Sequence, residues 1–398
     1  MTEPKYKNDL PGFTRAEFEH RAERARKLMR AEKLDGLLLT SQQNMEYLSG
    51  FISQFPWATP ARPWYFLLPR LGQPVAIIPT VGIENWRATS WVKEVRAWRS
   101  PNPENEGLDI LATTVKDIRR RYGRLGVELG AETRIGMPVG DLLRLRRKVR
   151  PFEMVDGTGV MRELRIIKSP AEIARLRRVC QIVCDTFDAL PSFVAAGDSE
   201  KEIMRKIKAH ASARGVDSTS YMMTNSGPGG VQSFIMGPTD RRIRAGDVLS
   251  IDAGCVYDGY FSDFDRNFAV GKASAEIERA HALLHKATDA GLAAARPGNT
   301  AEDVFKAQAN VIAPAGDAEG FTRMGRFGHG LGRVMTEPPS NMLGDKTVLR
   351  PGMALSIEPG MTLSGGQLFI HEENVAITED GCRLLTRRAP KRIPVIPC

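Results

Sequence analysis

The chain has 398 residues, of which 42% are hydrophobic and 26% are charged. This composition is typical of folded globular proteins and excludes a disordered or collagen-like chain. Its net charge of +9 comes from basic residues spread over helical stretches. Because no zinc-finger, RRM or helix-turn-helix pattern accompanies them, we expect no nucleic-acid partner.

The first 160 residues alternate helical and strand patterns. A helix is predicted over 14–32, where Thr14 can cap the first turn and apolar residues recur at helical spacing. Short apolar runs typical of strands cover 34–40, 64–69, 74–80 and 124–129, and a further helical segment covers 140–147. Two domains are expected for a chain of this length, and we predict that the first is an α/β domain over residues 1–160.

The second predicted domain spans residues 161–398 and opens with a strong helix start. Ser169 can cap this helix, Pro170 suits its first turn, and Glu172 completes a capping box. The remaining predicted elements are a helix over 199–215 ended by Gly215 at the C-cap, a β-hairpin around 257–259, helices from Ala273 and Ala301, strands at 352–358 and 367–378, and a Pro-rich extended tail.

Five potential metal ligands lie at turns or strand ends of this domain: Asp252, Asp263, His329, Glu358 and Glu372. The two aspartates stand on either side of the hairpin, so paired strands can present both carboxylates to one point. Glycines flank His329 and permit a close approach of the backbone. Glu358 ends an apolar strand, and Glu372 begins the last one. Four carboxylates and an imidazole, without a thiolate, suit two divalent ions such as Mn²⁺, Fe²⁺, Co²⁺ or Zn²⁺.

The ordered motifs D-x10-D, G-H-G, I-E-P-G and E-x5-T, preceded by the segment I-K-S-P at 167–170, resemble those of the prolidase, aminopeptidase P and creatinase family. The resemblance implies an α/β (α+β) architecture in which a pita-bread catalytic domain follows a creatinase-like N-terminal domain. It also implies a homodimer whose N-terminal domains border a neighbour's active site. The loop with Trp57, Arg62 and Trp64 is a candidate for that contact, although burial in the core accounts equally well for its tryptophans.

The resemblance further implies that a water held between two ions attacks the carbonyl of a C–N amide bond. Glu358 is then both a metal ligand and the candidate proton shuttle. Asp265 follows Asp263 by two residues and shares its strand face, and it stands where the family usually has a hydroxyl residue. Asp265 is therefore a candidate additional ligand, a hydrogen-bond partner of the ligands, or the ion-pair mate of Arg266.

Two histidines that contact the substrate in proline-specific members are missing from this chain. Ile235 and Thr336 stand in their places, and no histidine occurs between positions 210 and 281. Such imidazoles donate to the substrate carbonyl or oxyanion, and the loss of one donor typically costs about 100-fold in rate. Thr336 is therefore a candidate catalytic donor, unless the substrate is not an ordinary Xaa-Pro peptide.

Other groups that can supply the missing donors are Asn225, Ser226 and His371. His371 stands beside Glu372, but strand alternation is expected to turn it away from the face of that ligand. A structural role for His371 is the favoured interpretation.

We predict a dinuclear metallohydrolase of the prolidase type that cleaves an Xaa-Pro dipeptide or another small peptide-like substrate. A first alternative keeps the fold and metals but acts on a non-peptide amide or amidine, or as a lyase, which the missing histidines favour. A non-catalytic binding module is a second alternative, disfavoured because four converging carboxylates without cations would repel one another. A cytoplasmic location is expected because there is no apolar leader, no run of about 18 apolar residues and no C-x-x-C pair.

Overall fold

The computed structural model describes residues 12–53, 55–58, 62–233, 235–315 and 325–398. The chain divides into two compact units between Arg165 and Ile166. The boundary predicted from the sequence lies after residue 160. The reason for the difference is helix α6 (Thr158–Ile166), which buries Val160 and Leu164 in the core of the N-terminal unit. Among the helices of the described residues, none combines the length and apolar character needed to span a membrane.

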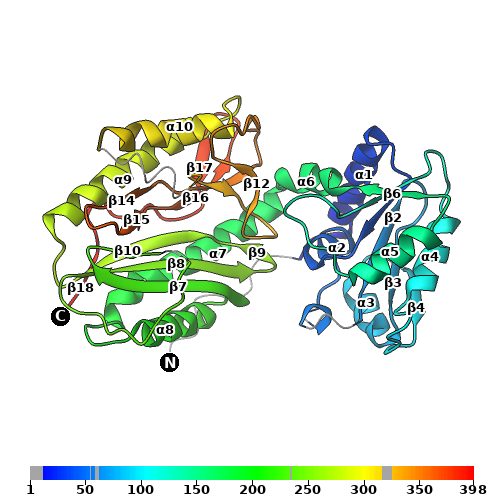
Figure 1. Cartoon of the computed structure of the whole chain (residues 1–398), viewed down its shortest axis with the longest axis horizontal. Coiled ribbons are helices and arrows are strands. Elements are labelled where there is room, and N and C mark those ends of the chain that lie inside the picture. Colours follow the sequence, from blue (N-terminus) through cyan, green and yellow to red (C-terminus); the bar gives the residue numbers. More distant parts are fainter. Residues whose placement is uncertain (1–11, 54, 59–61, 234, 316–324) are drawn as a thin grey trace. The chain divides into compact units, whose positions relative to one another are not determined.

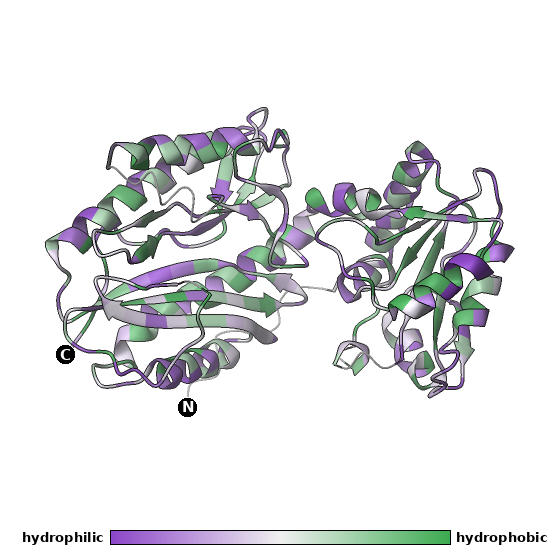
Figure 2. Ribbon diagram, in the orientation of Figure 1, coloured by the Kyte–Doolittle hydropathy of each residue, from purple (hydrophilic) through white to green (hydrophobic). Residues whose placement is uncertain are grey.

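The N-terminal unit is a mixed sheet of six strands covered by helices (Figure 1). In spatial order, the strands are β4 (Glu94–Trp98), β3 (Val75–Pro79), β2 (Tyr65–Pro69), β1 (Gly36–Leu39), β5 (Arg124–Val127) and β6 (Glu153–Asp156). The sheet forms one hydrophobic core with helices α1 (Arg15–Ala31), α2 (Gln42–Ser49), α3 (Ile83–Thr89) and α6. It forms a second hydrophobic core with α4 (Leu108–Asp117) and α5 (Val139–Lys148). Because both faces are covered, the central strands are continuously apolar, as Figure 2 shows by their colour.

The second unit contains two larger sheets and a small hairpin (Figure 1). The first sheet has the order β18 (Val395–Ile396), β10 (Phe264–Val270), β8 (Asp247–Tyr257) and β7 (Ser218–Pro228), and β9 (Tyr260–Phe261) pairs with β8. The second has the order β12 (Glu337–Ser340), β11 (His329–Gly330), β13 (Ala354–Ile357), β16 (Glu373–Ile377) and β17 (Cys382–Leu384), and β14 (Gly360–Thr362) pairs with β15 (Leu368–Ile370).

Two pairs of helices cover these sheets. Helix α7 (Pro170–Ala189) packs on β8 and α8 (Glu200–Ala213) packs on β7, whereas α9 (Ala275–Ala294) contacts β13, β14 and α10 (Ala301–Ile312). The predicted capping box at Ser169 and Glu172 is present and starts α7. The C-cap of α8 is Arg214 rather than Gly215, which lies one position later with a φ of 102°. Only a residue without a Cβ adopts that conformation without strain.

Several segments of this unit differ from the sequence prediction or add to it. Strand β7 was not predicted, because its sequence, STSYMMTNSGP, is too polar to indicate a strand. The predicted strand 367–378 is two strands, β15 and β16, which pair with different partners and leave His371 and Glu372 between them. The Pro-rich tail was predicted to be extended, and its residues Val395–Ile396 form β18 beside β10.

Candidate metal centre

The hairpin of β8 and β10 brings acidic side chains to one face of the first sheet. Asp258 and Gly259 have positive φ angles and form the turn between β8 and β9, as predicted. In the ladder, Asp265 is the Cα partner of Asp252, and Asp263 directly precedes β10. Since residues two apart on a strand share a face, Asp263 and Asp265 both lie on the side of the sheet that carries Asp252.

Glu372 completes a cluster of three carboxylates. One oxygen atom from each of Asp252, Asp263 and Glu372 lies within 4.8 Å of the other two. Asp263 and Glu372 are buried and Asp252 is partly exposed. Three carboxylates at this separation repel one another strongly when all are ionised, so the arrangement favours a cation among them.

His329 and Glu358 stand at the edge of the carboxylate cluster. Nε2 of His329 lies 3.3 Å from Oδ2 of Asp263 and 3.5 Å from Oε1 of Glu358. Nδ1 of His329 lies 2.9 Å from the carbonyl oxygen of Gly330, a distance at which it donates a hydrogen bond. This bond fixes the ring orientation and leaves the Nε2 lone pair free for a ligand, the usual arrangement of a metal-binding histidine.

A glycine allows this close packing. Gly328 has a φ of 130°, and a Cβ built on it would lie 2.2 Å from the carbonyl oxygen of Ser356. The hydroxyl of Ser356 accepts a hydrogen bond from the His329 N–H at 3.0 Å and donates to Oε1 of Glu358 at 3.3 Å. The glycine of the G-H-G motif therefore lets the His329 backbone pack closely against β13, the strand that precedes Glu358.

The clustered charges shift the pKa values of the predicted ligands. Burial is the main reason why the pKa values of Asp252, Glu358 and Glu372 are raised, and Asp263 raises all three further. Burial alone would lower the pKa of His329, but the carboxylates of Glu358 and Asp263 raise it. In the absence of a cation, the site therefore favours protonated carboxyls and a protonated imidazole.

The donor set fits divalent metal ions. Oε1 of Glu372 and Oδ1 of Asp265 are buried and have no hydrogen-bond partner among the described residues, a costly condition that a coordinated cation relieves. Carboxylate oxygens with one imidazole suit Mn²⁺, Fe²⁺, Co²⁺ or Zn²⁺. Asp265 is not part of the compact group of three carboxylates, and its other oxygen accepts a hydrogen bond from Nδ2 of Asn267 at 2.8 Å.

The side chain of Arg266 has a different partner from the one considered in the sequence. Its guanidinium pairs with the carboxylate of Glu373 at 3.0 Å, and its bond to Asp265 is made to the backbone oxygen. Asp265 is therefore held by Asn267 rather than by an ion pair with Arg266.

Tyr221 belongs to the site and was missed in the sequence. Its hydroxyl lies 3.0 Å from Oδ1 of Asp252 and also contacts Oδ1 of Asp263. The ring passes over Gly254, its ladder partner, where a Cβ would lie 2.0 Å from a ring carbon. Burial is the main reason why the pKa of Tyr221 lies well above its usual value, and the charge of Asp252 raises it further. The hydroxyl therefore stays protonated and acts as a hydrogen-bond donor. Because no strand was predicted over the residues of β7, Tyr221 had no predicted position beside the two aspartates.

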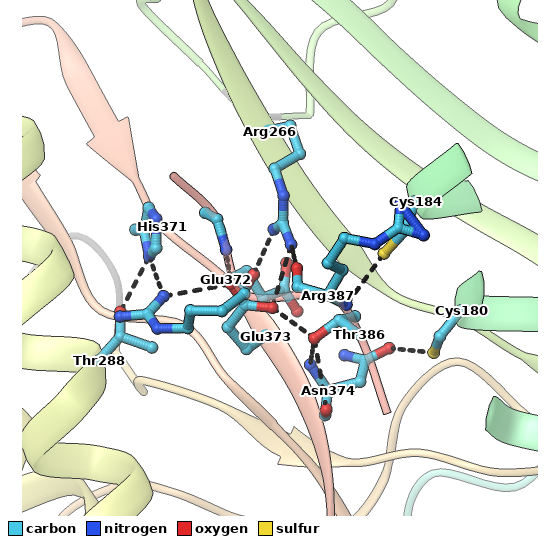
Figure 3. A network of polar contacts seen from close by, with 12 residues as sticks. Cys180, Cys184, Arg266, Thr288, His371, Glu372, Glu373, Asn374, Thr386 and Arg387 are labelled. Atoms are coloured by element: carbon cyan, nitrogen blue, oxygen red, sulfur yellow. Dashed lines mark hydrogen bonds and ion pairs between the residues drawn. The ribbon is translucent and has the colours of Figure 1, made fainter. Parts of the chain in front are cut away.

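Two of the four groups considered as replacements for the missing histidines are Thr336 and His371, which lie in different environments. Thr336 is half-buried, and its Oγ1 accepts a hydrogen bond from Nη2 of Arg326 at 3.4 Å. The imidazole of His371 is buried, and its Nδ1 lies 3.0 Å from Oγ1 of Thr288 (Figure 3). The same nitrogen lies 3.3 Å from Nη1 of Arg388. These contacts tie His371 to helix α9 and to the segment after β17, in keeping with a structural role.

The remaining candidates lie outside the carboxylate cluster. Ile235 is 90% exposed, and its side chain carries no polar group. Trp57 packs against the core of the N-terminal unit, and Trp64 stacks on Phe51 in the same core, so packing accounts for both tryptophans. Arg62 is half-buried and has a φ of 62°.

Comparison with known proteins places this geometry in a family. The profile of metallopeptidase family M24 matches residues 174–379, and that of the creatinase/prolidase N-terminal domain matches residues 21–167. The chain belongs to metallopeptidase family M24. It is a metallohydrolase with a creatinase-like N-terminal domain and a pita-bread catalytic domain, as the sequence predicted, and its family uses divalent metal ions.

Similar proteins include dipeptidases of bacteria and archaea. The chain is 30% identical over 370 residues to a probable dipeptidase PepE of Mycobacterium tuberculosis, covering 92% of each chain. It is 29% identical over 371 residues to an Xaa-Pro dipeptidase of Pyrococcus horikoshii, covering 90% of this chain and 94% of the relative. The crystal structure of dipeptidase PepE from Mycobacterium ulcerans superposes with a TM-score of 0.82 at 28% identity, covering 98% of this chain and 100% of the other.

Proposed function

We propose that this M24 metallohydrolase is a dinuclear dipeptidase of the prolidase type, which cleaves the C–N amide bond of an Xaa-Pro dipeptide or another small peptide-like substrate. The convergence of Asp252, Asp263 and Glu372 within 4.8 Å carries the proposal. His329 and Glu358 extend this group by one imidazole and one carboxylate. The names of the dipeptidase relatives support the peptide-like substrate.

Each ligand has a distinct role in this proposal. The carboxylates and His329 would hold two divalent ions, which would supply an activated water and electrostatic stabilisation of negative charge on the substrate carbonyl. Glu358 is also the proton shuttle, and the Ser356 hydroxyl at 3.3 Å orients its carboxylate. Tyr221 has its hydroxyl within hydrogen-bond distance of both aspartates and would hold the orientation of their carboxylates. Thr336 is the candidate donor to the substrate carbonyl.

A substrate panel tests the reaction. We expect about two Mn, Fe, Co or Zn ions per chain in protein purified without chelator, measured by mass spectrometry. The same protein should hydrolyse Xaa-Pro dipeptides in a metal-stimulated reaction that EDTA abolishes. Small amides and amidines form the second arm of the panel. Metal-stimulated cleavage of these compounds, with none of the dipeptides, would replace the dipeptidase proposal by the non-peptide alternative.

The non-peptide alternative is kept because of the missing imidazoles. Ile235 offers no hydrogen-bond donor, and Thr336 offers a single hydroxyl. A site that lacks two imidazole donors suits a substrate whose transition state needs less stabilisation from the protein.

The dipeptidase assignment is further supported by Arg326. The side chain is half-buried, and its Nη1 and Nη2 lie 3.4 Å from Oγ of Ser340 and Oγ1 of Thr336. The pKa values of Glu358 and His329 are raised overall, and the positive charge of Arg326 opposes both shifts. The described residues place no carboxylate within ion-pair distance of Arg326. The guanidinium is therefore available to the free carboxylate of a dipeptide.

We expect Arg326→Gln to raise KM for dipeptides about 10- to 100-fold with little change in kcat, since a lost charge-assisted hydrogen bond weakens binding by about 1.5–3 kcal/mol. Dipeptides blocked as C-terminal amides should be poor substrates for the wild type and should be unaffected by the substitution. Arg279→Gln, at an exposed position of α9, is the control and should leave KM unchanged. Equal losses for free and blocked dipeptides would contradict this role.

The oligomeric state and compartment remain predictions of the sequence. All five cysteines are free, which fits a reducing cytoplasm. A homodimer is the proposed assembly, and sedimentation velocity at micromolar concentration measures it directly.

A further inference from the structure

Asp263 and Glu372 reach the metal centre from two different sheets. Asp263 directly precedes β10 of the first sheet, and Glu372 directly precedes β16 of the second. No ladder joins β10 to β16 in the part of the chain that the structure describes. Because their carboxylates repel each other when ionised, their approach to within 4.8 Å requires that other bonds hold the two backbones.

The side chain of Asn374, on β16, bonds to both main-chain groups of Asp263. Its Oδ1 accepts a hydrogen bond from the Asp263 N–H at 3.0 Å, and its Nδ2 donates to the Asp263 carbonyl oxygen. Asn374 is fully buried, so water does not compete for these bonds. One side-chain amide therefore replaces the peptide group that a neighbouring strand would supply.

Arg266, on β10, makes the reciprocal connection to the second sheet. Its Nη1 donates to the backbone oxygens of Asp265 and Glu372, each at 2.7 Å, and its Nη2 donates to the backbone oxygen of Arg387 at 2.7 Å (Figure 3). The carboxylate of Glu373, at 3.0 Å, holds the guanidinium in this orientation. The planar fork of an arginine suits several acceptors at once, which an ammonium group does not.

We propose that Asn374 and Arg266 are positioning residues that clamp the two sheets together at Asp263 and Glu372 and so pre-organise the metal centre. This inference rests on the proposed metal-binding function. Without the clamp, the two carboxylates relax apart in the metal-free protein, and binding has to bring them back together. Loss of such partners of metal ligands typically lowers metal affinity about 10- to 100-fold. Turnover of the fully loaded enzyme changes little, because bound ions then hold the ligands.

Asn374→Leu tests the clamp, since leucine has a similar size and makes no hydrogen bond. We expect Mn²⁺ affinity, measured by calorimetric titration of chelator-treated protein, to fall about 10- to 100-fold. The kcat at saturating Mn²⁺ should stay within about threefold, and the Asp263 amide should exchange hydrogen faster in the metal-free protein. Thr186→Val is the matched control. Thr186 is buried, and its hydroxyl donates to the Ile182 carbonyl within α7, away from the clamp, so Mn²⁺ affinity should change less than about threefold.

Arg266→Lys provides a second variant, which keeps the positive charge beside Glu373 but cannot serve all the acceptors of the fork. We expect its Mn²⁺ affinity to fall about tenfold. If Asn374→Leu does not fold, Arg266→Lys decides alone. Wild-type affinity in a folded variant of either residue would overturn its part in the clamp. If the wild type itself binds no Mn²⁺, the metal-centre proposal fails, and the clamp proposal fails with it.

Discussion

Asp252→Asn is expected to stabilise the metal-free protein and to abolish the activity of the metal-supplied protein. An asparagine at this position keeps the shape of the side chain and its hydrogen bond with Tyr221 while it removes one carboxylate from a cluster of three. Without ions, burial and then mutual repulsion raise the pKa values of Asp252 and Glu372, and the substitution removes one of the repelling carboxyls. We expect the free energy of unfolding of the metal-free protein to rise by about 1–2 kcal/mol at pH 8.

The same substitution should reduce the stabilisation of the protein by metal. Wild-type protein gains stability from Mn²⁺ because the ions bind only the folded state, and the variant should lose most of this gain. Turnover should fall about 1,000-fold or more, which corresponds to about 4 kcal/mol of transition-state stabilisation. Thermal unfolding with EDTA and with Mn²⁺ measures the first effect, and kcat/KM measures the second.

Asp240→Asn is the matched control for this substitution. Asp240 is an exposed aspartate of the same unit, paired with Lys201 on the surface, so neither the Mn²⁺ stabilisation nor turnover should change. A metal-free Asp252→Asn protein that is less stable than the wild type would contradict the picture of a strained carboxylate cluster.

The parts of the site that the sequence predicted are those with a local signal. Asp263 and Glu358 stand directly beside the ends of β10 and β13, and Asp252 lies within the apolar strand β8. His329 stands between glycines that a close approach requires. The hairpin turn at Asp258 and the capping box at Ser169 follow from turn and cap chemistry alone. These features depend on a few neighbouring residues, so one sequence is sufficient to predict them.

The parts that the sequence missed depend on contacts between distant segments. Strand β7 is polar, and its pairing with β8 outweighs its weak propensity, so Tyr221 had no predicted place. The apolar run 367–378 gives no sign that it divides between two sheets at His371 and Glu372. The sequence around Asn374 indicates a strand residue and nothing more, because the role of its side chain depends on the backbone of Asp263, more than a hundred positions earlier in the chain.

The stability of the metal-free protein should depend on pH, with a sign that follows from the raised pKa values. Burial and neighbouring charges raise the pKa values of Asp252, Glu358 and Glu372 in the metal-free fold above their usual values of 3.8 and 4.5. The folded state therefore binds more protons than the unfolded state once the pH exceeds these usual values. Stability must then fall as the pH rises, with a slope of about 1.4 kcal/mol per pH unit for each carboxyl that is protonated only in the folded state.

Urea unfolding of EDTA-treated protein between pH 5 and 8 measures this slope. We expect stability to decrease throughout the part of the range in which the folded carboxyls remain protonated, and Asp252→Asn to flatten the curve. With saturating Mn²⁺ the decrease should disappear, because binding displaces the protons and becomes tighter as the pH rises. Calorimetry in buffers of different ionisation enthalpy should therefore record proton release on Mn²⁺ binding. A metal-free protein that gains stability between pH 5 and 8 would show that the carboxylates are already ionised in the fold. Their mutual repulsion would then no longer indicate that a cation lies among them.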